Sequence, residues 1–202
     1  MRAAAMTENP PAADVLQQLL APHMELSQDQ ARVVAASLRP VRFAAGERMY
    51  ERGERCADAV VLTQGLARAY YIHGGKEINL RLLCAPAVAI AMSSVITGEP
   101  STEWVETITD VQGFRTDVRG LSASGQELLA ERLMRILAEQ HYLALERRLH
   151  MLQSKSVAER YAFFCEHMPP DIVARTPGYH IASYLAVTPE TLSRVRKKPP
   201  GD

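Results

Sequence analysis

The chain has 202 residues, of which 47% are hydrophobic and 23% charged, a composition that excludes a largely disordered or fibrous protein. Lysine plus arginine and aspartate plus glutamate each number 23, so the formal net charge is zero, which disfavours a protein that coats nucleic acid non-specifically. The three cysteines are far apart, odd in number and without metal-ligand spacing, so we expect a reduced cytoplasmic protein.

The N-terminal segment and the longest uncharged run argue against export and membrane insertion. Residues 1–14 lack the apolar core of a secretory signal, so we expect a flexible tail there. The run Leu82–Gly98 contains Pro86 and is shorter than the roughly 20 mainly apolar residues that span a bilayer, which predicts a buried strand and turn. We therefore expect no membrane contact.

The following segments predict a helix and then a β domain. Ser27 and Gln30 form a capping-box pattern, which predicts a helix over Gln28–Ser37. Short strands separated by turn residues indicate an all-β sandwich or barrel between Val41 and about Val118. Paired glycines in the segment His73-Gly74-Gly75-Lys76 predict a hairpin turn, since they supply the positive φ that such a turn needs. The runs that predict strands are Arg48–Glu51, Ala59–Thr63, Leu66–Ile72, Glu77–Leu83, Trp104–Thr109 and Gly113–Asp117.

A long helix is predicted after the β domain. Ser124 and Glu127 form a second capping box, and no glycine or proline follows until after Met151. Apolar residues occupy two offset faces, so the helix needs two partners: its own domain and, we expect, the same helix of a second chain. The alternative is a helix buried within one domain. The residues expected at the dimer contact are Leu129, Leu133, Ile136 and Leu143; the second face holds Ala138, Tyr142, Leu145, Leu149 and Leu152.

The C-terminal part predicts three further helices. Ser156 and Glu159 form a third capping box, opening a helix that reaches about His167, with a loop over 171–178. A short helix from Tyr179 is followed by a second one that starts at Thr188.

The last two helices form a helix-turn-helix pattern. Thr188 is the expected N-cap, and Pro189 fits the first helical turn, where its missing N–H is harmless. The second helix would present Glu190 and Arg194 to base edges, because arginine bonds guanine bidentately and glutamate accepts from cytosine. The alternative is a helical hairpin with a solvated charged end. The full set of expected DNA-contacting residues is Thr188, Glu190, Thr191, Ser193, Arg194, Arg196, Lys197 and Lys198.

Two blocks carry a resemblance that covers roughly residues 20–198. The first contains Phe43-Ala44-Ala45-Gly46-Glu47, Gly53, Val60-Val61-Leu62, Gly65 and Gly75-Lys76-Glu77. The second contains Ile181-Ala182-Ser183-Tyr184-Leu185 and Thr188-Pro189-Glu190-Thr191-Leu192-Ser193-Arg194. The chain thereby resembles the cyclic-AMP receptor protein/Fnr family of bacterial transcription regulators, with its cyclic-nucleotide-binding jelly roll and C-terminal helix-turn-helix.

The resemblance implies an α+β protein that binds double-stranded DNA as a homodimer, with an effector pocket in each jelly roll and RNA polymerase as a candidate partner. The expected organisation is a tail (1–14), a jelly-roll sensor domain (15–120), a long dimerisation helix (121–153) and a DNA-binding domain with a reduced or absent wing (154–202). No enzymatic activity, metal or resident cofactor is expected.

The sequence departs from the family at the effector site and at the turn. The stretch Cys84–Ser94 has neither the glycine-glutamate pair nor the arginine that hold a cyclic nucleotide, so we expect a different small effector or none. Ser93, Ser94 and Thr102 are candidate hydrogen-bond donors in that pocket, with local turn capping as the alternative role. Ala186 replaces the family's turn glycine.

Two other classes of protein remain as alternatives. A sensor module that acts through protein partners would not need the basic end of the last helix, with Arg194, Arg196 and two lysines. A metal-dependent enzyme on a cupin-like barrel would need histidines on strands, whereas the histidines here lie mostly on predicted helices. A dimeric DNA-binding regulator is therefore the preferred interpretation.

Overall fold

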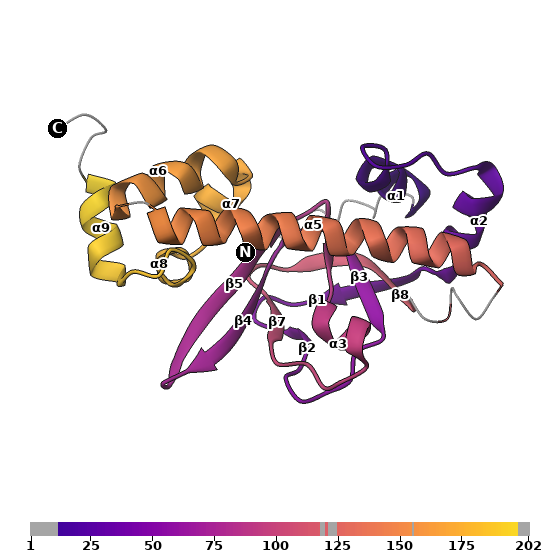
Figure 1. Cartoon of the computed structure of the whole chain (residues 1–202), viewed down its shortest axis with the longest axis horizontal. Coiled ribbons are helices and arrows are strands. Elements are labelled where there is room, and N and C mark those ends of the chain that lie inside the picture. The colour runs from indigo at the N-terminus through magenta and orange to yellow at the C-terminus, as the bar shows by residue number, and fades with distance from the viewer. Residues whose placement is uncertain (1–11, 118–119, 121–124, 155, 198–202) are drawn as a thin grey trace, which may run out of the picture.

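The structure is a computed structural model and describes residues 12–117, 120, 125–154 and 156–197 (Figure 1). A β domain occupies its centre, the helices α1 and α2 lie at one end, and a group of four C-terminal helices lies at the other (Figure 1). The helices are α1 (Ala12–Leu20), α2 (Gln28–Ser37), α3 (Met92–Thr97), α5 (Glu127–Ser154), α6 (Val157–His167), α7 (Pro170–Arg175), α8 (Gly178–Tyr184) and α9 (Pro189–Lys197).

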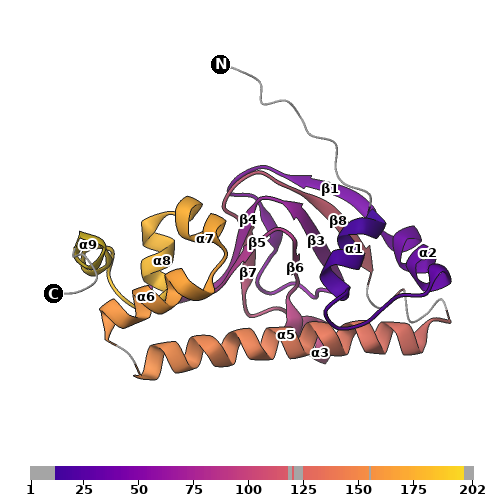
Figure 2. The ribbon, with the colours of Figure 1, turned by 90° about the horizontal axis from the view of Figure 1, so that it is seen from above.

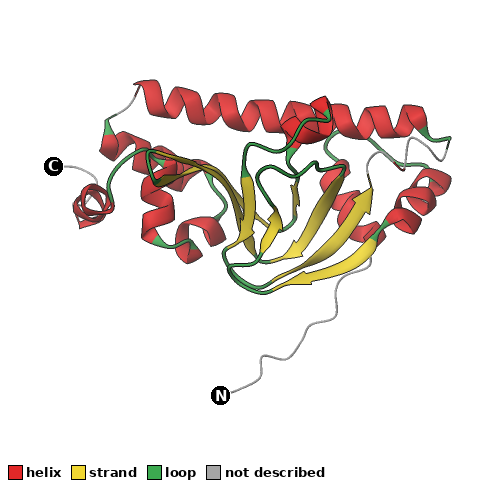
Figure 3. Cartoon of the chain, turned by 90° about the horizontal axis from the view of Figure 1, so that it is seen from below, coloured by secondary structure: helices red, strands yellow, loops and turns green. Residues whose placement is uncertain are grey.

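The β domain consists of two antiparallel sheets of four strands in the described chain, ordered β1-β8-β3-β6 and β2-β7-β4-β5. The two sheets pack face to face as a jelly-roll-like sandwich (Figure 3). Together with the helices they give the predicted fold class, α+β. The strands are β1 (Arg39–Phe43), β2 (Arg48–Tyr50), β3 (Asp58–Gln64), β4 (Leu66–His73), β5 (Lys76–Cys84), β6 (Ala87–Ala89), β7 (Trp104–Thr107) and β8 (Val111–Asp117).

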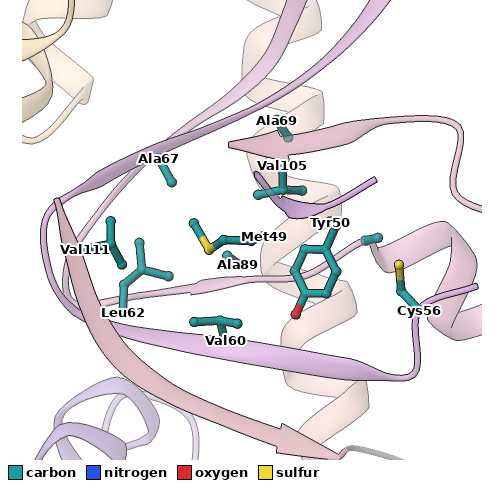
Figure 4. Close-up of a cluster of buried hydrophobic side chains, with 11 residues drawn as sticks. Met49, Tyr50, Cys56, Val60, Leu62, Ala67, Ala69, Ala89, Val105 and Val111 are labelled. Carbon is teal, nitrogen blue, oxygen red and sulfur yellow. The ribbon is translucent and has the colours of Figure 1, made fainter. Parts of the chain in front are cut away.

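The core of the sandwich is made by inward-facing side chains of both sheets. Val60 and Leu62 of β3 are fully buried, and between them Val61 points to the opposite face, where it packs with α1 and α2. Met49 and Val105 of the second sheet point toward them (Figure 4). Strand β3 is therefore buried on both faces, with one face in the sandwich core and the other against the helices.

Local sequence signals explain several element boundaries. The Ser27 hydroxyl accepts from the Gln30 N–H at 3.2 Å, which confirms the predicted capping box of α2. The capping box of Ser156 on α6 is confirmed in the same way. The predicted hairpin is also confirmed, with His73 paired with Lys76 and positive φ at Gly74 and Gly75. Ser124, the predicted cap of α5, lies outside the described residues.

Some predicted loops contain short elements. Helix α1 begins at Ala12, inside the segment predicted as a tail, and α7 occupies most of the predicted loop 171–178. The run Leu82–Gly98 contains β6 and the helix α3 as well as the end of β5. These elements have three to nine residues, and helices this short are not stable on their own. Helices α1, α3 and α7 depend instead on the burial of Leu16, Val95 and Ile172, respectively.

The long helix α5 connects the two ends of the molecule. It runs beside the β domain from the end that carries α1 and α2 to the C-terminal helices (Figures 1 and 2). The C-terminal helices have their own core, in which Phe164, Ile172, Ile181 and Leu192 are almost fully buried. Leu66 and Leu82 of the β domain join this core, so the two parts of the chain share a packed boundary.

Candidate functional site

Helices α8 and α9 are joined by a tight turn whose geometry is set by its backbone. The Leu185 N–H donates to the Ile181 carbonyl at 2.9 Å, and the Val187 N–H donates to the Ala182 carbonyl at 3.0 Å. Between them Ala186 has a φ of 55°, the left-handed conformation in which alanine costs roughly 1 kcal/mol more than glycine. The helix-turn-helix geometry is therefore kept although the turn lacks glycine.

The N-terminus of α9 is capped as its sequence predicts. The Thr188 hydroxyl accepts from the Thr191 N–H at 3.2 Å, and Pro189 begins the helix. Glu190 is exposed in the first turn, and hydrogen bonds from its own backbone N–H and from Thr188 lower the pKa of its carboxyl group. Glu190 is therefore an ionised acceptor on the surface.

One face of α9 is exposed and polar. Glu190, Ser193, Arg194 and Lys197 are exposed at the three- and four-residue spacing of a single helix face, while Leu192 points into the core at 1% exposure. The Arg194 guanidinium donates to the Thr191 hydroxyl at 3.3 Å, which restrains it near the start of the helix. The chain thus presents one acceptor and two cations on an otherwise unpartnered helix face.

One predicted DNA-contacting residue stands apart from this face. The Arg196 guanidinium lies 5.4 Å from the centre of the Tyr161 ring of α6, so it packs on its own domain. Lys198 lies outside the described residues. The exposed face of α9 therefore consists of Glu190, Ser193, Arg194 and Lys197, with Thr188 and Thr191 at its start.

A buried polar network joins α8 to the hairpin of β4 and β5. Arg68 is 3% exposed and donates to Glu77 at 2.5 Å, to Glu106 at 2.8 Å and to His180 Nδ1 at 3.2 Å. Asn79 donates to the His180 carbonyl at 3.0 Å. We call Arg68, Glu77, Asn79, Glu106 and His180 the interdomain cluster.

A second set of hydrogen bonds runs beside the interdomain cluster. The Asn79 N–H donates to the Ser183 hydroxyl at 3.0 Å, and that hydroxyl donates to the Glu77 carbonyl at 2.7 Å. The position of α8, and through it of α9, is therefore tied to the β domain by buried, satisfied polar groups. Sequence reasoning missed this cluster, because the residues of α8 lie more than one hundred residues along the chain from their partners in β4 and β5.

The interdomain cluster should make the stability of the protein depend on pH. Burial, and then the charge of Arg68, lower the pKa of His180 to about 4, whereas an unfolded histidine titrates near 6.5. Protonation is thus disfavoured only in the folded state, so stability is complete above pH 6.5 and falls as the pH drops toward 4.

We expect His180 to account for about 2 kcal/mol of that loss, after an allowance for solvent screening. Urea unfolding at a series of pH values measures the slope, and His180→Asn, which keeps an acceptor for Arg68, should flatten it. The half-buried His141, with a pKa also lowered to about 4, leaves a residual slope. An unchanged slope in H180N would contradict this role of His180.

The faces of α5 differ from the predicted ones. Leu129 and Ile136 are buried within the chain, and Leu133 is half-buried beside them. Leu128 is exposed at the start of the helix, and the other exposed apolar residues lie farther along it, with Leu143 among them. The expected contact at Leu129, Leu133 and Ile136 therefore has to be revised, because the protomer itself covers these side chains. The unpartnered apolar positions of α5 are Leu128, Tyr142, Leu143, Leu145 and Leu149.

Of the three predicted effector-binding hydroxyls, that of Ser94 is used locally. The buried Ser94 hydroxyl donates to the Glu99 carbonyl at 2.6 Å and accepts from the Cys56 N–H at 3.0 Å. Ser93 and Thr102 are exposed. None of the three residues lines the cavity that lies between the β domain, α1 and α5. The geometry of Ser94 favours local turn capping, the alternative role.

A cavity of about 260 Å³ lies between the β domain, α1 and α5. Its walls come from Leu16 and Leu20 of α1, Val61 of β3, and Leu133 and Ile136 of α5, and they are mainly apolar. Two of the residues predicted at the dimer contact thus form one wall of an internal cavity. The sequence carries no sign of this cavity, because its lining residues are scattered over most of the chain.

One end of the cavity is polar. Arg81 of β5 is 7% exposed and donates to the carboxylate of Glu103, itself buried, and to the Ile90 carbonyl at 3.1 Å. His141 of α5 also lines the cavity, and burial together with the nearby charge of Arg81 lowers its pKa. Among the residues that the structure describes, no group of three or more His, Cys, Asp or Glu side chains could hold a metal ion.

Comparison with solved structures identifies the architecture. The chain is similar to FixK2 from Bradyrhizobium japonicum, with 18% identity, a TM-score of 0.69, and coverage of 82% of this chain and 89% of that one. It is similar to a CooA mutant from Carboxydothermus hydrogenoformans at 18% identity, with a TM-score of 0.64 and coverage of 96% and 84%. TTHB099, a CRP-family transcriptional regulator from Thermus thermophilus, matches at 23% identity, with a TM-score of 0.61 and coverage of 77% and 82%.

The fold of this chain is therefore that of the CRP/FNR transcriptional regulators. No protein-family model and no curated protein sequence matches the chain. None of the described helices combines the length and hydropathy that a membrane-spanning helix requires.

Proposed function

We propose that the protein is a homodimeric, sequence-specific DNA-binding transcription regulator. The observation that carries the proposal is the exposed face of α9, on which Glu190, Arg194 and Lys197 stand free of the domain core. A capped helix of this kind fits the major groove, with its N-terminal residues at base edges. The shared fold with CRP/FNR regulators supports this assignment.

The dimeric state is supported by the exposed apolar positions of α5. Tyr142 is 62% exposed and Leu149 51% exposed, and Leu145 lies between them on a helix that is not otherwise covered there. Apolar residues clustered on one helix indicate a protein contact. Two-fold pairing of α5 would place two copies of α9 on one DNA duplex, in major grooves about one turn apart.

The cavity of the β domain is the proposed effector site, and its effector is not a cyclic nucleotide. The charge of Arg81 is already matched by Glu103, so no cation is left to hold a phosphate in a mainly apolar space. The interdomain cluster supports a route for control, because it links the hairpin of the β domain to α8.

Replacing Arg194 with alanine should weaken binding to the matched DNA site by about 1–3 kcal/mol per half-site and relax one base position. The side chain is exposed and contributes little to the core, so the stability of the protein should not change. Fluorescence anisotropy with the matched site and with variants of it measures both effects.

Arg32→Ala is the matched control, because Arg32 is an exposed arginine of α2 whose ion pair with Asp29 lies far from α9 in sequence and in the fold (Figure 1). Equal DNA affinities of the R194A and R32A variants would contradict the assignment of α9 to the major groove. DNA would then be bound by another surface of the protein.

A further inference from the structure

Arg81, which lines the cavity, carries a buried donor without an acceptor among the described residues. The Arg81 Nη2 atom is engaged by Glu103 and by the Ile90 carbonyl, whereas Arg81 Nε has no hydrogen-bond partner among the described residues. A buried N–H without a partner is costly, and a group that supplies an acceptor there recovers the lost interaction. The cavity is therefore prepared for one hydrogen-bond acceptor.

The charge balance at this end decides what kind of acceptor fits. Arg81 and Glu103 form a buried ion pair, so their charges cancel. The lowered pKa of His141 keeps its imidazole uncharged near neutral pH. An incoming carboxylate or phosphate would approach the carboxylate of Glu103 with no further cation to compensate it, whereas an uncharged carbonyl oxygen adds no charge.

The remainder of the lining favours an apolar ligand body. Most of it consists of leucine, isoleucine, valine and alanine side chains. The other polar residues in the lining are Thr116, His23 and Gln140, and the Thr116 hydroxyl is already in contact with that of Ser37 at 2.9 Å. A volume of about 260 Å³ lies just below the range of roughly 300–1,000 Å³ typical of ligand pockets, so the ligand is small.

We propose that this cavity binds a small, uncharged, mainly apolar molecule with one hydrogen-bond acceptor, such as an aliphatic ketone or ester, whose oxygen accepts from Arg81 Nε. The inference rests on the proposed function in one respect: the bound ligand would be the effector of the proposed regulator. Leu133 and Ile136 of α5 form one wall, so an occupied cavity fixes α5 against the β domain.

The test compares three molecules of similar length on the purified full chain: methyl heptyl ketone, nonanoate and nonane. Displacement of a neutral naphthylamine dye measures their affinities. We expect the ketone to bind at least tenfold more tightly than nonane or nonanoate, because the bond to Arg81 is charge-assisted and needs a neutral partner. Methyl pentyl ketone should bind about tenfold more weakly than methyl heptyl ketone, since it buries two fewer methylene groups.

Two variants locate the site. Arg81→Lys keeps a cation opposite Glu103 and removes the Nε donor, so the advantage of the ketone over nonane should fall below threefold. Leu133→Trp fills the cavity and should abolish displacement by all three molecules, with circular dichroism as the check on folding. Tightest binding by nonanoate, no binding by any of them, or unchanged binding in L133W would each overturn the inference.

Failure of this inference can be told apart from failure of the proposed function. A chain that selects a DNA site but binds none of the three molecules contradicts the ligand class alone. A chain that binds the ketone and selects no DNA, with or without the ketone, contradicts the DNA-binding function and leaves the ligand assignment standing.

Discussion

Replacing Leu145 and Leu149 of α5 with glutamate should convert the proposed dimer into monomers. Both side chains are exposed in the protomer, so the variant should fold normally, but dimerisation would bury two carboxylates per chain without partners. We expect the dimer dissociation constant to rise by at least about a thousandfold, or about 4 kcal/mol. Binding to a two-half-site operator should be lost with it, because each monomer contacts only one half-site.

Light scattering and sedimentation equilibrium measure the oligomeric state of L145E/L149E, and thermal unfolding checks the fold of the protomer. Tyr179→Glu is the control, since Tyr179 is an exposed aromatic residue of α8 and not of α5. A double variant that stays dimeric at the concentrations of the parent would show that the contact lies elsewhere. A charge at Ile136 is a different experiment, because Ile136 is buried and its replacement would unfold the protomer.

Replacing Arg68 with methionine should destabilise the protein by about 3–5 kcal/mol. The change leaves the carboxylate of Glu106, 16% exposed, without its buried cation, with the half-exposed Arg48 near it at 3.7 Å, and removes a donor to His180. The loss should fall on the boundary between the β domain and α8, since Arg68 contacts residues of both parts. Urea unfolding measures the change, and hydrogen exchange locates it.

Arg48→Ala is the matched control, because Arg48 also lies near Glu106, at 3.7 Å, but with a half-exposed side chain. An exposed pair of this kind contributes at most about 1 kcal/mol. Glu106→Gln in the R68M background should restore part of the stability by removing the unpaired charge. A cost for R68M no greater than that for R48A would contradict the structural role of the interdomain cluster.

The elements with strong local signals could be predicted from the sequence. Capping boxes place the starts of α2 and α6, and paired glycines place the hairpin after His73, because each signal acts within four residues. The turn and cap at Ala186 and Thr188 are equally local, so the helix-turn-helix is evident from the sequence. The short α3, α7 and β6 carry no such signal, because tertiary burial stabilises them.

The site could be predicted only in part. Periodicity shows that α5 is apolar on two faces, but it cannot tell which face the protomer covers, and Leu129 and Ile136 prove to be interior. The cavity and the interdomain cluster join residues from distant parts of the chain, so no spacing in the sequence reveals them. Arg81 of β5 and Glu103, the residue before β7, become partners only when the chain folds, because 22 residues separate them in the sequence.

The most direct test of the central claim is selection of DNA sites from random duplexes by the purified chain, followed by a salt titration of the selected site. The account predicts a near-palindromic motif whose half-sites lie about one helical turn apart, with an affinity that falls steeply as salt rises. The L145E/L149E variant should fail to select it. No enriched motif, or a single half-site bound equally well by that variant, would contradict a dimeric DNA-binding regulator.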